Sequence, residues 1–162
     1  AVGAALAAAL EPVEVHAVDI DPVAVRCAHR NLAPVGGRLY EGDLYRPLPA
    51  ALRGRVGILV ANAPYVPTGA IGLLPPEARM HEPRAALDGG ADGLDVLRRV
   101  AAGAPAWLAP GGHLLVETSR SQAPVAADAF ARSGLLTQVV GSVELDATVV
   151  VGTRPAAAGT VG

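Results

Sequence analysis

Val56-Gly57-Ile58-Leu59-Val60-Ala61 is an apolar run rich in β-branched residues, and Asn62-Ala63-Pro64-Tyr65 follows it at once. The run predicts a buried strand, and the abrupt change to a polar turn predicts that this strand stops at a binding site. Pro64 fixes its own φ angle and favours an extended conformation at Ala63, so the turn is expected to be stiff.

A stiff turn of this kind can hold a planar amino group. The side-chain oxygen of Asn62, beside a backbone carbonyl, makes a pair of acceptors for the two N–H donors of such a group. Tyr65 offers a flat face against which the group can lie. The alternative is a plain strand-ending Asn-x-Pro turn with Tyr65 packed on the surface, and these four residues alone do not decide between the two.

Working outward, helical and strand patterns alternate over the first two-thirds of the chain. Asp21-Pro22 is a typical helix start, with Asp as N-cap and Pro at the first helical position, and this helix is expected to reach Leu32. Gly36-Gly37 is expected to break this helix, and residues 66–90 are expected to form a long, irregular segment. Residues 110–112 predict a turn before a strand at 113–118, and Ser119 or Ser121 is expected to start the next helix. Residues 135–140 and 147–153 predict a closing pair of strands. The alternation predicts an α/β fold with an open, mostly parallel sheet and helices on both faces.

Four polar residues fall at predicted strand ends, where such sheets bind ligands: Asp19, Asp43, Asn62 and Glu117. A carboxylate at Asp19 could accept both hydroxyls of a ribose, or it could cap the next helix, for which Asp21 is the better candidate. Asp43 could accept from the amino group of an adenine beside the Leu44 N–H, or it could be a turn aspartate after Gly42.

Composition narrows the function classes. The chain has 162 residues and a formal net charge of −2, and all its basic residues are arginines. Without lysine there is no phosphate loop of the Gly-Lys type, and no Ser, His and Asp pattern suggests a triad. There is no basic run for nucleic acid, although a local patch is not excluded. The histidines lack ligand spacing, so no metal site is expected.

The cysteine content and the apolar runs of the sequence bear on the cellular compartment and on membrane association. The single cysteine, Cys27, excludes an internal disulfide, fits a reducing compartment, and is expected to be a buried, inert thiol in a helix. No apolar run approaches the roughly 20 residues that span a bilayer, so no membrane association is expected. The sequence does not specify the oligomeric state.

The order of three motifs resembles class I S-adenosylmethionine-dependent methyltransferases, and the last motif resembles their amino-methylating branch: Ala17-Val18-Asp19, Gly42-Asp43 and Asn62-Ala63-Pro64-Tyr65. The stretches that follow resemble the HemK/PrmC type, protein-glutamine methyltransferases that modify the Gly-Gly-Gln motif of peptide-chain release factors. They are Glu82-Pro83, Ala86-Leu87, Gly89-Gly90, Asp92-Gly93-Leu94, Leu108-Ala109-Pro110-Gly111-Gly112 and Leu114-Leu115-Val116-Glu117.

This resemblance implies a Rossmann-like class I methyltransferase fold, a cytoplasmic enzyme, S-adenosylmethionine as cofactor and a release factor as protein substrate. It implies that residues 1–154 form the catalytic domain and that 155–162 are a disordered tail. The implied cofactor segments are Asp19-Ile20 and Asp43-Leu44, with Asn62 adjoining the cofactor. The implied catalytic corner is Asn62 and the Ala63 carbonyl as acceptors, with Pro64 and Tyr65 completing the pocket.

The sequence departs from the family pattern in three ways. Ala63 stands where the family usually has proline. The glycine-rich cofactor loop, the first strand and the helical N-terminal domain of the family are missing from the chain. We expect the apolar strand and the glycine loop just upstream of Ala1, and the sequence does not say whether the helical domain is there too. Two other functions stay open: an adenine amino-methyltransferase acting on DNA or RNA, and a non-catalytic binding module with the same fold.

Overall fold

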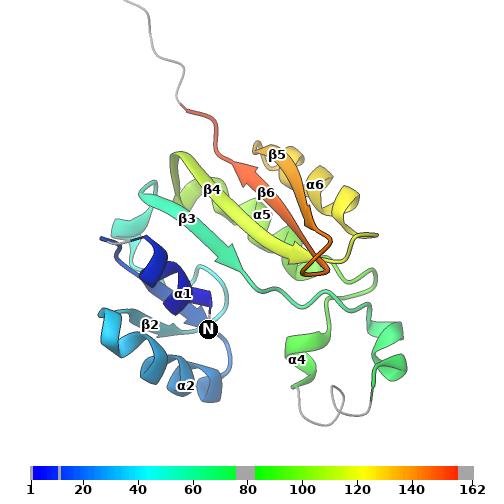
Figure 1. The fold of residues 1–162 in the computed structure, drawn as a ribbon, viewed down its shortest axis with the longest axis horizontal. Helices are drawn as coiled ribbons and strands as arrows, with labels where there is room; N and C mark the ends of the chain where they lie inside the picture. The colour runs from blue at the N-terminus through cyan, green and yellow to red at the C-terminus, as the bar shows by residue number, and fades with distance from the viewer. Residues whose placement is uncertain (1, 11, 76–82, 157–162) are drawn as a thin grey trace, which may run out of the picture. The chain divides into compact units, whose positions relative to one another are not determined.

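The computed structural model describes residues 2–10, 12–75 and 83–156, and Figure 1 shows their elements. The chain forms two compact units, Ala1–Ala51 and Leu52–Gly162. Each unit has its own sheet, so each is described by itself. No helix within the described ranges has both the length and the apolar character that crossing a membrane would require.

The first unit pairs two strands in parallel. Helix α1 (Val2–Ala9) comes first, and α2 (Pro22–Leu32) connects β1 (His16–Asp19) to β2 (Arg38–Glu41) through the short 3-10 helix η1 (Ala33–Val35). The strand register runs from His16 opposite Arg38 to Asp19 opposite Glu41. Because the strands are parallel, their carboxyl ends lie at the same edge of this small sheet.

The α2 helix has the start that the sequence predicts. The Asp21 side chain accepts a hydrogen bond from the Val23 N–H at 2.8 Å, and Pro22 occupies the first turn. Gly36 then takes a left-handed conformation with φ of 65° after η1, which turns the chain toward β2. The predicted bounds of this helix are therefore confirmed.

The second unit has a four-stranded sheet in the order β3-β4-β6-β5. Strands β3 (Val56–Ala61) and β4 (Leu108–Thr118) are parallel and are connected through α5 (Asp95–Trp107). Strand β6 (Ala147–Thr153) is antiparallel to both β4 and β5 (Leu136–Ser142). The predicted closing pair of strands is thus confirmed. Strand β3 is formed as predicted, but the prediction that it is buried is wrong, because it lies at an edge of the sheet and Ile58 and Val60 are 42% and 39% exposed.

One face of this sheet is covered by helices α5 and α6 (Ala123–Arg132) (Figure 1). Leu114 pairs with Gly152 across β4 and β6, so the two share a face. A Cβ on Gly152 would come within 2.6 Å of the Phe130 ring of α6. The fully buried side chains of this core come from both helices and the sheet: Leu94, Leu97, Val100, Leu108, Leu114, Val116, Phe130 and Val150.

Some sequence predictions about element starts are wrong. Helix α6 begins at Ala123 instead of Ser119 or Ser121, and β4 already begins at Leu108. The predicted turn at 110–112 is an irregularity inside β4, because the β3–β4 register shifts there. Cys27, expected to be buried, is exposed.

The long segment after β3 is less irregular than expected. It contains η3 (Thr68–Leu73), a 3-10 helix, and α4 (Arg84–Leu87), and a second 3-10 helix, η2 (Ala50–Leu52), precedes β3. Glu82, which belongs to the resemblance, lies outside the described residues, as do Ala1 and residues 157–162 of the predicted tail. The predicted domain bounds stay a prediction.

Candidate active site

The corner Asn62–Tyr65 begins directly after β3, whose last residue Ala61 pairs with Val116. Asn62 is exposed, while Ala63 keeps only 7% of its surface accessible and Tyr65 keeps 44%. Ala63 is thus packed into the protein between two residues that face outward. This places the corner at the carboxyl end of a parallel strand, where open α/β sheets bind their ligands.

The backbone just after the corner is tied down by hydrogen bonds. The Val66 N–H donates to the Leu87 carbonyl at 3.1 Å, and the Val66 carbonyl accepts from the Gly89 N–H at 2.9 Å. These two bonds form an isolated parallel bridge between Val66 and Asp88. The corner is therefore anchored to a segment more than twenty positions later in the chain.

The two acceptors that matter most for ligand binding are left unused. Across the part of the chain that the structure describes, neither the Asn62 side chain nor the Ala63 carbonyl takes part in a hydrogen bond. Asn62 is exposed, whereas Ala63 is buried, and buried carbonyls are normally paired. Two neighbouring acceptors left free inside a tied-down turn are available for a ligand with two donors.

Gly89 and Gly93 allow the close approach that locks the corner. A Cβ on Gly89 would lie 2.6 Å from the Pro64 carbonyl oxygen and 2.3 Å from that of Gly93. A Cβ on Gly93 would lie 2.2 Å from the Tyr65 carbonyl oxygen, and Gly93 has a φ of +83°. Both positions therefore require glycine, which gives the Gly89-Gly90 and Asp92-Gly93 motifs of the sequence a structural role.

Further hydrogen bonds join this segment to its neighbours. Thr68 donates its N–H to the Gly90 carbonyl at 2.8 Å and its hydroxyl to Asp88 Oδ1 at 2.6 Å. The Asp95 N–H donates to the Gly89 carbonyl at 2.8 Å. The first turn of α5 is thereby connected to the segment that carries the corner.

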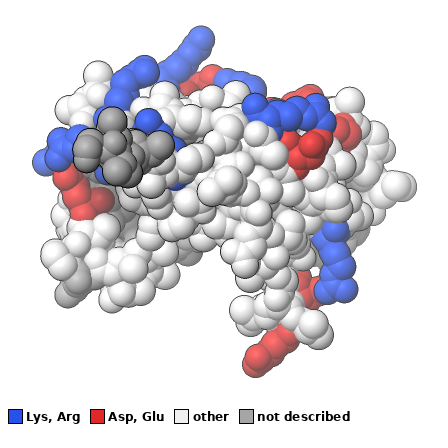
Figure 2. Space-filling view, turned by 90° about the horizontal axis from the view of Figure 1, so that it is seen from above, with Lys and Arg blue, Asp and Glu red and all other residues white. Residues whose placement is uncertain are grey.

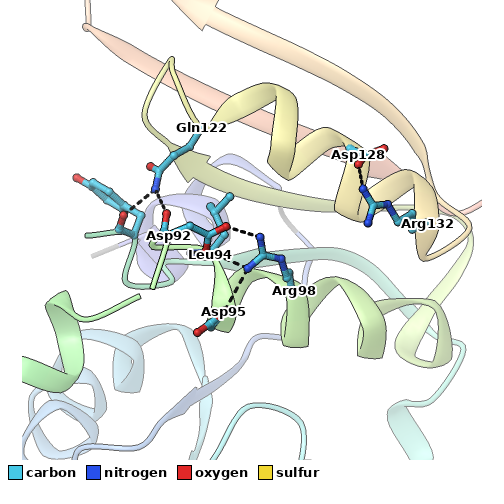
Figure 3. A network of polar contacts seen from close by, with 8 residues as sticks. Asp92, Leu94, Asp95, Arg98, Gln122, Asp128 and Arg132 are labelled. Carbon is cyan, nitrogen blue, oxygen red and sulfur yellow. Dashed lines mark hydrogen bonds and ion pairs between the residues drawn. The ribbon is translucent and has the colours of Figure 1, made fainter. Parts of the chain in front are cut away.

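Gln122, which sequence reasoning missed, bridges the corner to the loop before α5 (Figure 3). Its Nε2 donates to the Tyr65 carbonyl at 2.9 Å and to the Asp92 carbonyl at 3.1 Å. Its Oε1 accepts from the Ser119 hydroxyl at 2.7 Å. No local pattern marks this residue, because its two carbonyl partners lie 57 and 30 positions away.

Asp92 is held in turn by Arg98 of α5 (Figure 3). The guanidinium donates to Oδ1 at 2.9 Å and to Oδ2 at 2.5 Å, which is the bidentate arrangement of a strong pair. These hydrogen bonds from Arg98, helped by the Leu94 N–H, lower the pKa of Asp92 to about 2. Asp92 is therefore ionised at neutral pH.

The first unit carries the other predicted ligands. Asp19 is the exposed last residue of β1, and its Oδ1 accepts from the Asp21 N–H at 2.9 Å. Ile20 is 64% exposed. The cap of α2 is Asp21, so the alternative in which Asp19 caps this helix is excluded.

Asp43 and Leu44 follow β2 by way of Gly42. The Gly42 N–H donates to the Asp19 carbonyl at 2.9 Å, which brings the start of this turn to the end of β1. Leu44 is half-buried and has a positive φ of 50°, an uncommon conformation for a leucine. Burial also raises the pKa of the neighbouring Tyr45 phenol, which stays protonated at all ordinary pH values.

Other kinds of site are not evident among the described residues. No three side chains of His, Cys, Asp or Glu converge there as metal ligands. A shallow hollow in the first unit is lined by residues such as Ala7 and Val35 and contains none of the predicted ligands. On the face shown in Figure 2, basic and acidic side chains lie next to one another in most charged groups, and much of the surface carries no charge.

Comparison with curated proteins gives relatives of one kind. The chain is 43% identical over 135 residues to a release factor glutamine methyltransferase from Geobacter sulfurreducens, a match that covers 82% of this chain and 46% of the relative. It is 44% identical over 119 residues to a ribosomal protein uL3 glutamine methyltransferase from Bordetella pertussis, covering 70% of the chain and 39% of the relative. The chain thus spans about half the length of the curated relatives it matches. No family model matches it.

Solved structures show the fold. A methyltransferase from Pyrococcus furiosus matches 94% of the chain, with a TM-score of 0.63 and 15% identity, over 70% of its own length. A ribosomal protein L11 methylase from Lactobacillus delbrueckii matches 95% of the chain, with a TM-score of 0.64 and 16% identity, over 64% of its length. The predicted class I methyltransferase fold is thereby confirmed.

Proposed function

We propose that this chain, which belongs to the glutamine methyltransferase family of its curated relatives, is part of an enzyme that methylates a glutamine side-chain amide in a protein. Relatives are named for release factors or for ribosomal protein uL3. We further propose a peptide-chain release factor as substrate and, with it, a cytoplasmic location.

The free acceptor pair of the corner carries this proposal. A glutamine amide is planar and has two N–H donors, and Asn62 Oδ1 and the Ala63 carbonyl are two acceptors without hydrogen bonds in the described structure. The next two carbonyls along the chain are less available to a ligand. Pro64 O is packed against Gly89, and Tyr65 O is bonded to Gln122. Asn62 Oδ1 and the Ala63 carbonyl are therefore two neighbouring acceptors that remain open to a ligand among the described residues.

The residues of the first unit fit the proposed cofactor. The Asp19 carboxylate is exposed at the end of β1, and carboxylate oxygens are the acceptors that suit ribose hydroxyls. Asp19 and Ile20 would hold the ribose side of S-adenosylmethionine, and Asp43 and Leu44 would adjoin its adenine. When bound, S-adenosylmethionine supplies a methyl group already activated by a sulfonium. A glycine-rich loop in the rest of the full-length protein belongs to the same proposal.

The chemical task of the corner is orientation. An amide nitrogen is a weak nucleophile, because its lone pair is shared with the carbonyl. By accepting both N–H groups, Asn62 and Ala63 fix the direction of the nitrogen and place partial negative charge where positive charge develops on it. Tyr65 offers a flat, exposed ring beside the amide plane. The proton that leaves the nitrogen can pass to solvent, so no general base is required at this site.

The test uses the full-length protein and radiolabelled S-adenosylmethionine, with a release factor, ribosomal protein uL3, DNA and RNA as separate acceptors. We expect label in the Gly-Gly-Gln glutamine of the release factor. Asn62→Ala should lower kcat roughly 100- to 1,000-fold, the usual effect of losing one transition-state contact.

Asn31→Ala is the matched control, because Asn31 is the other asparagine of the chain and is exposed on α2. Its kcat should equal that of the wild type. Label in adenine instead of glutamine would replace the proposal with the nucleic acid alternative. Absence of S-adenosylmethionine binding by the full-length protein would favour a binding module.

A further inference from the structure

Gln122 uses nearly all of its hydrogen-bonding capacity to join three segments of the second unit. Both N–H groups are donated to backbone carbonyls, one to Tyr65 and one to Asp92, and Oε1 accepts from the Ser119 hydroxyl. Thr118, the last residue of β4, is also within 3.5 Å of Oε1 through its hydroxyl. Figure 3 shows the Gln122 amide pointing toward Asp92 in the loop before α5.

The position of Gln122 is itself fixed from several directions. Its backbone is held in the turn before α6, because the Gln122 N–H donates to the Ser119 carbonyl at 3.1 Å. Ser119 holds the oxygen of the amide, so only the NH₂ end can face Tyr65. The second carbonyl partner, Asp92, is anchored by the bidentate pair with Arg98. The amide is thus a rigid strut with both ends fastened.

The strut acts on one atom of the proposed catalytic corner. Tyr65 O is two peptide units beyond the Ala63 carbonyl, and Pro64 between them has a fixed φ, so holding Tyr65 O restricts the directions that the Ala63 carbonyl can take. Gly93 approaches the same oxygen closely, since a Cβ there would lie 2.2 Å from it. A hydrogen bond and a steric contact therefore hold Tyr65 O from two sides.

We propose that Gln122 is a positioning residue for methyl transfer, which aims the Ala63 carbonyl at the substrate amide through its hydrogen bond to Tyr65 O. This inference rests on the proposed function of the corner. Gln122 does not touch the reacting atoms. Its effect is on geometry, and misplacement of a reacting group by about 1 Å can cost as much as 100-fold in rate.

The decisive variant is Gln122→Glu in the full-length protein. A carboxylate of the same shape has no N–H to donate, so the Tyr65 and Asp92 carbonyls lose their partner and face an anion. Gln122→Met, of similar length and uncharged, removes the donors without the repulsion. Gln138→Glu on β5 is the matched control, because it makes the same change at an exposed site in a different strand.

Two measurements are needed. The first is deuterium uptake by the peptide covering residues 60–70, which requires neither cofactor nor substrate. The second is kcat per bound S-adenosylmethionine, together with the KM for the cofactor. We expect faster uptake at 60–70 and a roughly 10- to 100-fold lower kcat in both Gln122 variants, with the cofactor KM unchanged. Gln138→Glu should match the wild type in deuterium uptake, in kcat and in the cofactor KM.

Normalising to bound cofactor separates positioning from loss of folded protein, since a merely structural role would lower the folded fraction and leave kcat per site intact. Unchanged uptake at 60–70 would overturn the inference, and so would a kcat per site within twofold of the wild type. If the wild type methylates no amide substrate, the proposed function fails, and the uptake measurement still decides whether Gln122 holds the corner.

Discussion

The two strand-end turns that carry the candidate ligands are held in different ways. The turn at Asp19 after β1 is fixed by side-chain hydrogen bonds that span only two positions, Asp19 to the Asp21 N–H and Asp21 to the Val23 N–H. The corner at Asn62 after β3 is fixed by partners that lie tens of positions away in the chain, including Gln122 at 57. The Asp19 side chain is thus oriented by local contacts, although its carbonyl also accepts from the distant Gly42 N–H, whereas the corner is held by distant contacts.

This difference matches the tasks proposed for the two turns. A ribose ligand needs one exposed carboxylate, and a local turn supplies it. An amide substrate needs two acceptors at a fixed distance and angle to each other. One of them is the Ala63 backbone carbonyl, whose direction depends on the backbone and not on a side-chain rotamer. Distant contacts are the means of fixing such a carbonyl, so we expect the corner to be sensitive to changes far from it and the Asp19 turn to be insensitive.

The largest effect should come from Gly93→Ala. The new Cβ would lie 2.2 Å from the Tyr65 carbonyl oxygen, and the residue would have to keep a φ of +83°. The conformational cost of about 1–2 kcal/mol and an overpacking cost of about 1–3 kcal/mol add to roughly 2–5 kcal/mol of unfolding free energy. Urea unfolding measures the loss, and kcat should fall with it because the corner is displaced.

Gly134→Ala is the control that isolates the contact. Gly134 has the same φ of +83°, but nothing lies within 4 Å of the Cβ position. It should therefore lose only the conformational part, about 1–2 kcal/mol, and keep its kcat. If Gly93→Ala and Gly134→Ala lose the same unfolding free energy, the close approach of Gly93 to the Tyr65 carbonyl does not stabilise the corner. The corner would then not depend on distant contacts more than the Asp19 turn does.

A smaller and different effect is expected at Asp19. Asp19→Asn keeps an oxygen for the Asp21 N–H but removes the charge that hydroxyl groups would bind. A hydrogen bond to a charged group contributes about 1.5–3 kcal/mol, so the Kd for S-adenosylmethionine should rise roughly 10- to 150-fold, while kcat at saturation stays near that of the wild type. Calorimetry on the full-length protein measures the Kd.

Asp21→Asn is the neighbouring control, since asparagine caps helices as well as aspartate does. It should leave both the Kd and the unfolding free energy unchanged. If Asp19→Asn instead lowers kcat and leaves the Kd alone, the two turns would share one task and the distinction between them would be wrong.

The same contrast explains what could be predicted from the sequence. The α2 bounds follow from the Asp21-Pro22 start and the break at Gly36, and the β3 strand follows from its β-branched run, because each signal lies within a few residues. The placement of Asp19 and Asn62 at strand ends follows from the same local signals. Their side-chain chemistry suggested acceptors for a ribose and for an amino group, and the resemblance narrowed these ligands to S-adenosylmethionine and a glutamine amide.

The rest depends on contacts that the local sequence does not encode. Ser119 was a reasonable helix start, but its hydroxyl is bonded to the Gln122 side chain, and the helix begins only at Ala123. Cys27 was expected to be buried but is exposed, because the packing of α2 decides which of its faces is covered. The glycines at 89 and 93 were recognised as motif positions, yet the reason for them is a carbonyl more than twenty positions earlier.

The smallest effect should appear at the Asp92–Arg98 pair. Its side chains are 49% and 42% exposed, so solvent screens the pair and its contribution to stability is small. The pKa of Asp92 is lowered from 3.8 to about 2, mainly by the hydrogen bond from Arg98. A carboxyl with a lowered pKa stabilises the folded state above its unfolded pKa, and this stabilisation is lost as pH falls from about 4 through about 2.

Asp92→Asn keeps one oxygen for the Leu94 N–H but removes the charge and the second acceptor that Arg98 uses. Its Tm should lie slightly below that of the wild type above pH 4, and the gap should close by pH 2. Deuterium uptake at residues 60–70 should rise slightly at neutral pH, because Asp92 also carries the carbonyl that Gln122 binds. Asp128→Asn breaks the exposed Asp128–Arg132 pair on α6 (Figure 3), which is not bonded to this network, and should leave that uptake unchanged. If the Tm difference between Asp92→Asn and the wild type does not depend on pH, the Asp92 charge does not act through Arg98. The Asp92–Arg98 pair would then contribute nothing to holding the Gln122 amide.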